Sequence, residues 1–163
     1  MRSLLDFLEK ILAILTILSI GVMLILIFAQ VITRYVFGYT PPFGEEMARY
    51  LFVWTVFFSL PLLARKGGHM CIETITSRLH GATLKFFNIV ADIFTIIFLA
   101  ILSWQGVKMV SFASFQTSPA MDISMSYVYW VIPLGSFVML LFTIENLWKV
   151  LHTPADQMGR KEG

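Results

Sequence analysis

The hydrophobic residues of this chain form four long runs, and polar or charged residues separate them. The runs cover residues 11–33, 47–64, 86–107 and 123–144, and the first and last contain no charged residue. A helix needs about 20 apolar residues to cross a hydrocarbon core of about 30 Å. The second run is the shortest, so Arg49 and Arg65 must extend their charged groups towards the two interfaces. The pattern therefore predicts four transmembrane helices.

The segments between these runs carry turn and interface signals. Residues 38–44 contain two glycines and two prolines, which indicate a turn, and Gly67-Gly68 breaks the chain after the second run. Residues 70–80 alternate apolar and polar positions in a way that predicts a short amphipathic helix in the membrane interface. We expect an all-α integral membrane protein with a single membrane domain, residues 1–151, and a polar tail, residues 152–163.

The composition supports a lipid environment. Hydrophobic residues make up 58% of the 163 residues and charged residues 13%, against about 45–50% and about 25% in soluble domains. The formal net charge of +2 is too small and too scattered to indicate nucleic-acid binding. A single cysteine excludes an internal disulfide and any Cys-x-x-Cys site. We expect membrane lipids, and no nucleic acid, as surroundings of the chain.

The distribution of basic residues predicts the orientation. With four spans, both termini lie on one side of the membrane, and Lys and Arg accumulate on the cytoplasmic side. The side that holds the termini carries Arg2, Lys10, Arg65, Lys66, Arg78, Lys85, Lys149, Arg160 and Lys161. The opposite side carries Arg34, Arg49 and Lys108. We therefore expect cytoplasmic termini. The first run also exceeds the about 7–15 residues of a secretory signal core, which favours an uncleaved first helix.

The sequence lacks the residues that most catalytic and cofactor-binding sites require. All three histidines, His69, His80 and His152, lie outside the four runs, so paired haem ligands within the membrane are not expected. No His-Glu-x-x-His motif or Ser/His/Asp set is evident. We predict no enzyme activity, no metal site and no cofactor; a membrane-bound enzyme or quinone-linked subunit is the weaker alternative.

Asp92 is the only ionisable residue well inside a predicted span. In one interpretation it serves as a proton or cation site, or contacts a polar group of a partner. In the interpretation that we favour, it lies about two turns from Lys85 and reaches the cytoplasmic interface, because burying an unpaired charge in hydrocarbon is costly. The first interpretation leaves an alternative function open, an autonomous dimeric cation or drug antiporter with Asp92 as the coupling acid.

A charged cluster is predicted where the first two helices join. Glu45 and Arg49 stand four residues apart and Glu46 and Arg49 three apart, so both pairs are neighbours on one helix. Arg34 ends the preceding helix on the same side of the membrane. We expect these two acids and two arginines to converge; the alternative is a solvated set of charges at headgroup level with no partner.

Three motifs carry a resemblance to a known family. They are Arg34-Tyr35-Val36-Phe37-Gly38, the run from Glu45-Glu46 through Arg49 to Trp54 with a following Arg65 and His69, and Ser126-Tyr127-Val128-Tyr129 with Pro133-Leu134-Gly135. Together, over about residues 31–140, they resemble the small membrane subunit (DctQ/SiaQ-like small permease) of tripartite ATP-independent periplasmic (TRAP) transporters. Phe43-Gly44 departs from the pattern, because many relatives have a tryptophan just before the paired acids.

The resemblance implies a function and partners. Small subunits of this family bind a large bacterial inner-membrane subunit, which holds the Na⁺ and substrate sites and moves as an elevator. A periplasmic substrate-binding protein delivers an organic acid, such as a C4-dicarboxylate or sialic acid. The resemblance thus implies a non-catalytic scaffold subunit. Residue by residue, it assigns Arg34, Glu45, Glu46, Arg49 and Trp54 to a signature corner, and it assigns Arg65 and His69 to the cytoplasmic exit of the second helix.

Overall fold

The computed structural model describes residues 2–65 and 82–152, which form four long helices and one short one. The long helices are α1 (Arg2–Phe37), α2 (Pro42–Arg65), α4 (Ala82–Ala113) and α6 (Val131–His152); the short helix α5 (Ser126–Tyr129) precedes α6. Among these described residues, four spans are long and apolar enough to cross a membrane: Leu5–Phe37, Pro42–Arg65, Thr83–Ala113 and Ser126–His152. The prediction of an all-α membrane protein with four transmembrane helices is confirmed.

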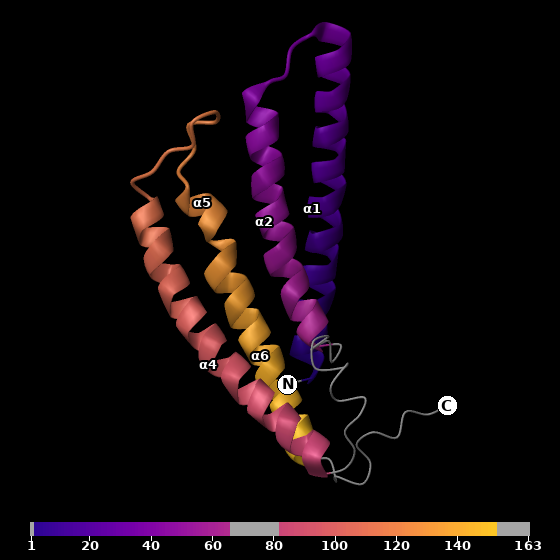
Figure 1. Ribbon diagram of the computed structural model, residues 1–163, viewed down its shortest axis with the longest axis vertical. Helices are drawn as coiled ribbons and strands as arrows, with labels where there is room; N and C mark the ends of the chain where they lie inside the picture. Colours follow the sequence, from indigo (N-terminus) through magenta and orange to yellow (C-terminus); the bar gives the residue numbers. More distant parts are fainter. Residues whose placement is uncertain (1, 66–81, 153–163) are drawn as a thin grey trace, which may run out of the picture.

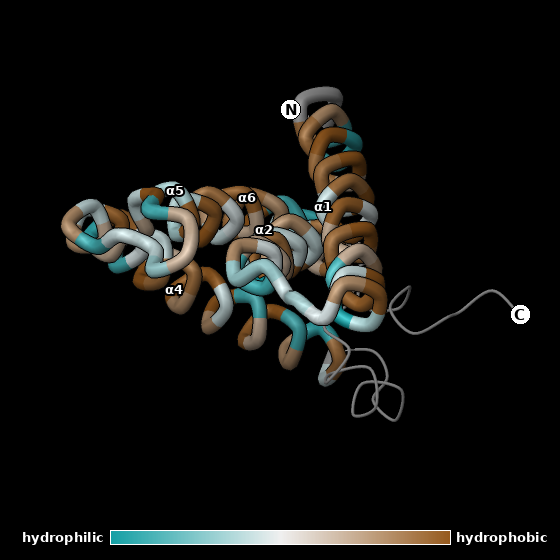
Figure 2. Tube along the Cα trace, turned by 90° about the horizontal axis from the view of Figure 1, so that it is seen from above, coloured by the Kyte–Doolittle hydropathy of each residue, from teal (hydrophilic) through white to brown (hydrophobic). Residues whose placement is uncertain are grey.

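The helices stand side by side in the order α1, α2, α6, α4. The principal contacts join α1 with α2, α2 with α6, and α6 with α4. Figure 1 shows the α1–α2 pair and the α4–α6 pair leaning against each other, and Figure 2 shows the row from above with α1 at one edge. We call the end where α1 joins α2 and α4 joins α5 the hairpin end. The opposite end, where α1 begins and α6 ends, is the terminal end.

The helices extend beyond the hydrophobic runs that predict them. α1 has 36 residues and is about 54 Å long at about 1.5 Å per residue, which exceeds a hydrocarbon core of about 30 Å. Its first turns carry Asp6 and Glu9, because polar residues fit a helix that has left the hydrocarbon. The last helical span begins later than the fourth hydrophobic run predicts: Ile123 lies in a loop, and helical structure starts at Ser126.

The α5–α6 boundary has a simple cause. Pro133 lies in the first turn of α6 and has no N–H to donate to the preceding turn, so the regular hydrogen-bond series is interrupted beside Trp130. The two helices still continue one another, and residues 126–152 form a single span. The predicted interfacial helix, residues 70–80, and the tail beyond His152 lie outside the described residues.

The core lies along α2 and α6 and is completed by the first turns of α1. Its buried members are Leu5, Leu12, Phe58, Val131, Val138 and Phe142. Two glycines set the spacing of the helices. A Cβ at Gly135 would lie 2.6 Å from the Phe57 carbonyl oxygen, and a Cβ at Gly106 would lie 3.1 Å from the Pro133 ring. The backbones of α2, α6 and α4 therefore approach closely at these two crossings.

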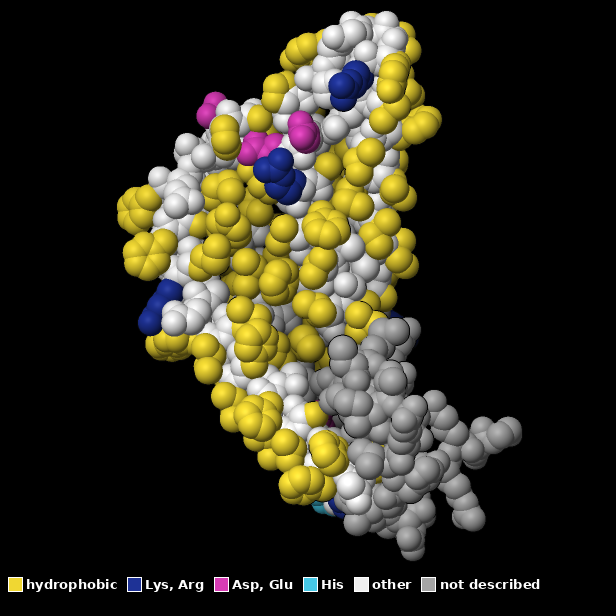
Figure 3. Space-filling model, in the orientation of Figure 1, with side chains coloured by type: hydrophobic (Ala, Val, Ile, Leu, Met, Phe, Trp, Pro, Cys, Tyr) yellow, Lys and Arg dark blue, Asp and Glu magenta, His cyan; other side chains and the backbone are white. Residues whose placement is uncertain are grey.

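The outer surface is largely apolar. Figure 3 shows hydrophobic side chains over most of the described part of one face, with charged groups mainly towards the hairpin end and one Lys or Arg at the edge of α4. On α1, Ile17 and Ile25 are about 70% exposed, and on α4 Phe94 is 69% exposed. Exposed apolar area on this scale needs hydrocarbon or another protein as its surroundings.

Candidate functional site

Three side chains on one face of α2 attach this helix to the α4–α5 loop and to α5. Glu46, Tyr50 and Trp54 recur every four residues and so lie one above another; we call them the α2 ladder. The Tyr50 hydroxyl donates to Glu46 Oε1 at 2.5 Å and also lies 3.3 Å from the Met125 sulfur. The ladder therefore begins with a polar pair that is internal to α2 and contacts the residue just before α5.

The other two contacts of the α2 ladder reach backbone groups. Glu46 Oε2 accepts a hydrogen bond from the Ala120 N–H at 3.0 Å. Trp54 Nε1 donates to the Val128 carbonyl oxygen at 3.1 Å, and its ring makes an edge contact with Phe58. Because each contact is to a position far along the chain, the α2 ladder sets the height of α2 relative to the second helix pair.

The four charged residues predicted to converge at the hairpin end are Arg34, Glu45, Glu46 and Arg49. Within the described residues, no ion pair joins Arg34, Glu45, Glu46 and Arg49. The two oxygens of Glu46 are occupied by Tyr50 and Ala120, and Arg34, Glu45 and Arg49 are exposed. The described residues therefore show no direct ion pair among these four charges, and their convergence stays a prediction.

A steric contact takes the place of the expected ion pairs between α1 and α2. A Cβ at Gly44 would lie only 2.6 Å from Gln30 Nε2. The absence of a side chain at Gly44 therefore makes room for Gln30 of α1, and the first two helices meet closely just below their connection.

Arg65 is the centre of a charged cluster at the terminal end. Its guanidinium pairs with Asp6, with Glu9 Oε2 at 2.6 Å and with Glu145 Oε2 at 3.8 Å, and it donates to the Leu5 carbonyl oxygen at 2.8 Å. It also lies 5.3 Å from the centre of the Phe142 ring. The arginine side chain is only 12% exposed. We call Arg65 with Asp6, Glu9 and Glu145 the Arg65 cluster; it joins α1, α2 and α6.

The sequence singles out Arg65 but not its acidic partners. Asp6 and Glu9 precede the first hydrophobic run, and Glu145 directly follows the fourth. Acids that flank two apolar runs at the same predicted membrane level as an arginine are a usable signal, because helix ends at one interface lie at one height. Lys149 completes the arrangement by pairing with Glu145 at 2.8 Å.

Comparison with known proteins identifies the family. A family model described as the DctQ component of tripartite ATP-independent periplasmic transporters matches residues 23–153. The match covers all of α2, α4, α5 and α6 and the part of α1 from Met23 to Phe37, and it includes the α2 ladder and Arg65. The chain belongs to this family. The match begins after Asp6 and Glu9, so the acids that α1 contributes to the Arg65 cluster lie outside it.

Individual relatives of this DctQ-family chain agree with the family match. A Haemophilus influenzae protein named as a TRAP transporter small permease is 31% identical over 123 residues, which are 76% of this chain and 74% of the relative. The C4-dicarboxylate TRAP transporter small permease DctQ of Rhodobacter capsulatus is 30% identical over 59% of this chain and 43% of the relative. The sialic acid TRAP transporter permease SiaT of Haemophilus influenzae is 25% identical over 74% of this chain, which matches only 20% of that longer protein.

The buried acid of this DctQ-family chain has a partner inside the chain. Asp92 is 1% exposed, and Asn146 Nδ2 of α6 donates to its Oδ2 at 3.0 Å. The carboxyl group is thus covered by α6, and its height relative to the cytoplasmic interface stays a prediction. Within the described residues no group of three or more His, Cys, Asp and Glu side chains could hold a metal ion. His69 lies outside the described residues.

Proposed function

We propose that this DctQ-family chain is the non-catalytic small scaffold subunit of a Na⁺-coupled TRAP transporter that imports an organic acid. It assembles in the bacterial inner membrane with a large membrane subunit, which carries the Na⁺ and substrate sites. A periplasmic substrate-binding protein delivers the acid. Three relatives are named for C4-dicarboxylate, sialic acid and isethionate TRAP transporters, which supports a small organic anion as the substrate of this system.

One observation carries the proposal: within the described residues, the polar side chains that make contacts over a long distance in the sequence join the chain's own helices. The α2 ladder joins α2 to the α4–α5 loop and α5, and the Arg65 cluster joins three helices. Asp92 faces Asn146. Membrane carriers instead place ionisable groups or broken helices along a path near the midplane. A row of helices with apolar outer faces supports a role as a wall of a larger assembly.

The same proposal orients the chain. We place the terminal end, with the Arg65 cluster, on the cytoplasmic side, and with it His69, which follows Arg65 by four residues in the sequence. The hairpin end then faces the periplasm, where the exposed side chains of Arg34 and Glu45 are available to the large subunit or to the binding protein. Glu46, Trp54 and Arg65 contact other segments of the same chain, so their role in assembly is to hold the shape that the partner recognises.

Co-purification tests the proposal. An affinity-tagged copy of this chain is expressed together with the large TRAP membrane subunit from the same genome, and the two proteins are extracted in mild detergent. The expected result is one complex with equal amounts of both proteins. Recovery of the tagged chain by itself, with the large subunit well expressed and folded, would contradict a scaffold role.

A further inference from the structure

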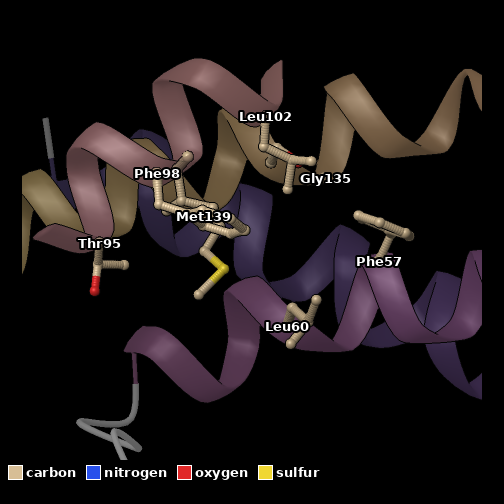
Figure 4. A pocket seen from close by; sticks show the side chains of 9 residues that line it. Phe57, Leu60, Thr95, Phe98, Leu102, Gly135 and Met139 are labelled. Atoms are coloured by element: carbon tan, nitrogen blue, oxygen red, sulfur yellow. The ribbon is translucent and has the colours of Figure 1, made fainter. Parts of the chain in front are cut away.

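An apolar groove lies between α2 and α4, with α6 as its floor. Figure 4 shows Phe57 and Leu60 of α2 on one wall, Phe98 and Leu102 of α4 on the other, and Gly135 and Met139 of α6 between them. The cavity volume is about 160 Å³. The groove exists because α2 and α4 both pack on α6 and not mainly on each other. It therefore opens sideways, towards whatever surrounds the helices.

The groove offers no hydrogen bond to a polar occupant. Its two hydroxyl groups are used within their own helices: Thr95 Oγ1 donates to the Ala91 carbonyl oxygen at 2.8 Å, and Ser136 Oγ donates to the Ile132 carbonyl oxygen at 2.7 Å. Apolar cavities of this size stay free of water. The lining therefore fits a hydrocarbon chain as the occupant.

A cation stands above the groove on the same face of α2. Eleven positions separate Arg49 from Leu60, which at about 100° per residue brings the two within about 20° of each other around the helix. The same eleven positions span about 16 Å, close to the half-thickness of about 15 Å of a hydrocarbon core. Arg49 is exposed and, in the described part of the chain, takes part in no recorded ion pair.

These positions match the two ends of a lipid molecule. We propose that the groove holds one acyl chain of a phospholipid from the leaflet at the hairpin end, and that the Arg49 guanidinium binds the phosphate of the same lipid. Side chains on a helix point towards its N-terminus, so Arg49 reaches away from the groove towards the headgroups. A phosphate is the anion present at that depth in every leaflet, and guanidinium–phosphate hydrogen bonds are charge-assisted.

Photo-crosslinking tests the proposal on the full chain in lipid nanodiscs. The probe is phosphatidylglycerol with a diazirine in the middle of one acyl chain, diluted in unlabelled phospholipid, and labelled peptides are mapped by mass spectrometry. We expect labels concentrated at residues 95–102 and 135–139. Arg49→Gln should lower this labelling about tenfold, as expected for loss of a charge-assisted hydrogen bond. Arg34→Gln, an exposed arginine of α1 at the same end, should leave it unchanged.

A second pair of variants tests the groove itself. Thr95→Phe places a ring in the groove and should remove its labelling, whereas Ile97→Phe, an exposed position of the same helix that does not line the groove, should not. Helical circular dichroism and a single gel-filtration peak establish that each variant is folded. Labelling spread evenly over α1 and α4 would overturn the proposal, because it would show bulk lipid contact only.

The complex with the large subunit distinguishes lipid from protein as the occupant. If groove labelling persists in the co-purified complex, the lipid site is part of the assembled transporter. If it disappears, and a photo-reactive residue at position 60 instead crosslinks to the large subunit, the groove is a protein interface and the lipid proposal is wrong.

Discussion

Replacing Arg65 by methionine should loosen the terminal end of the molecule. Methionine keeps most of the apolar stem and its contact with Phe142, but it removes the charge that three acids share. The first turns of α1 then lose the pairs through Asp6 and Glu9 and the hydrogen bond from Arg65 to the Leu5 carbonyl oxygen. Glu145, which is 11% exposed, keeps its pair with Lys149.

The expected cost follows from the exposure of each partner. The pair with Asp6, which is 57% exposed, contributes little. Glu9 is 34% exposed and forms a short charge-assisted contact, and Glu145 is nearly buried. Removing one member of a fully buried pair costs about 3–5 kcal/mol. The cost is smaller here because Asp6 and Glu9 are partly exposed. We expect Arg65→Met to lower the free energy of unfolding by about 2–4 kcal/mol.

The assay is equilibrium unfolding by SDS in mixed micelles, followed by circular dichroism. Arg34→Met is the matched control, because Arg34 is exposed and lies at the other end of α1; its change should stay within about 0.5 kcal/mol. Arg65→Lys keeps the positive charge but loses the planar guanidinium group. Its loss of unfolding free energy should lie between those of Arg65→Met and Arg34→Met. If Arg65→Met and Arg34→Met unfold alike, the Arg65 cluster does not hold the helices together.

Three further predictions address other contacts. Gly135→Ala should lower the free energy of unfolding by about 1–3 kcal/mol, because its Cβ would lie 2.6 Å from the Phe57 carbonyl oxygen. Gly21→Ala is the control, since a Cβ there would meet nothing within 4 Å, and it should cost nothing. Equal effects of the two changes would refute the close approach of α2 and α6 at Gly135. Trp54→Phe removes the hydrogen bond to Val128 and should lower the free energy of unfolding by about 1 kcal/mol. Phe52→Leu, at a 57% exposed position, should change it little. Equal effects of the two changes would show that the α2 ladder is not a fixed contact. Asp92→Asn should leave uptake by the assembled transporter intact. Asp92→Leu removes this partner of Asn146 and should lower the free energy of unfolding by about 1–3 kcal/mol. Loss of uptake in a folded Asp92→Asn variant would show that Asp92 serves as a coupling acid.

The sequence predicts the membrane spans well because span length depends on the hydrocarbon thickness alone. It does not predict where helices end, since α1 continues through Asp6 into polar surroundings. It also does not predict which faces meet, because helices that are apolar on all sides have no amphipathic pattern to read. The partners of Glu46 illustrate this limit: spacing within α2 suggested Arg49, whereas Tyr50 and the distant Ala120 occupy its oxygens.

Arg65 shows the opposite case. Its position at a span end marks it as notable, and its partners lie at two other span ends, so a comparison of helix ends at one membrane level offers a signal for them that the sequence analysis did not use. The Asp92–Asn146 contact needed the knowledge that α4 packs on α6. Contacts between helices that are neighbours in the row but not in the sequence therefore require the structure.

Reconstituted uptake shows whether this chain needs the large subunit for transport. Proteoliposomes with an inward Na⁺ gradient receive either this chain alone or this chain with the large subunit, and the cognate periplasmic binding protein supplies radiolabelled organic acid. We expect uptake only in the vesicles that contain both membrane proteins. Sodium- or proton-driven uptake by vesicles that contain this chain alone would contradict it.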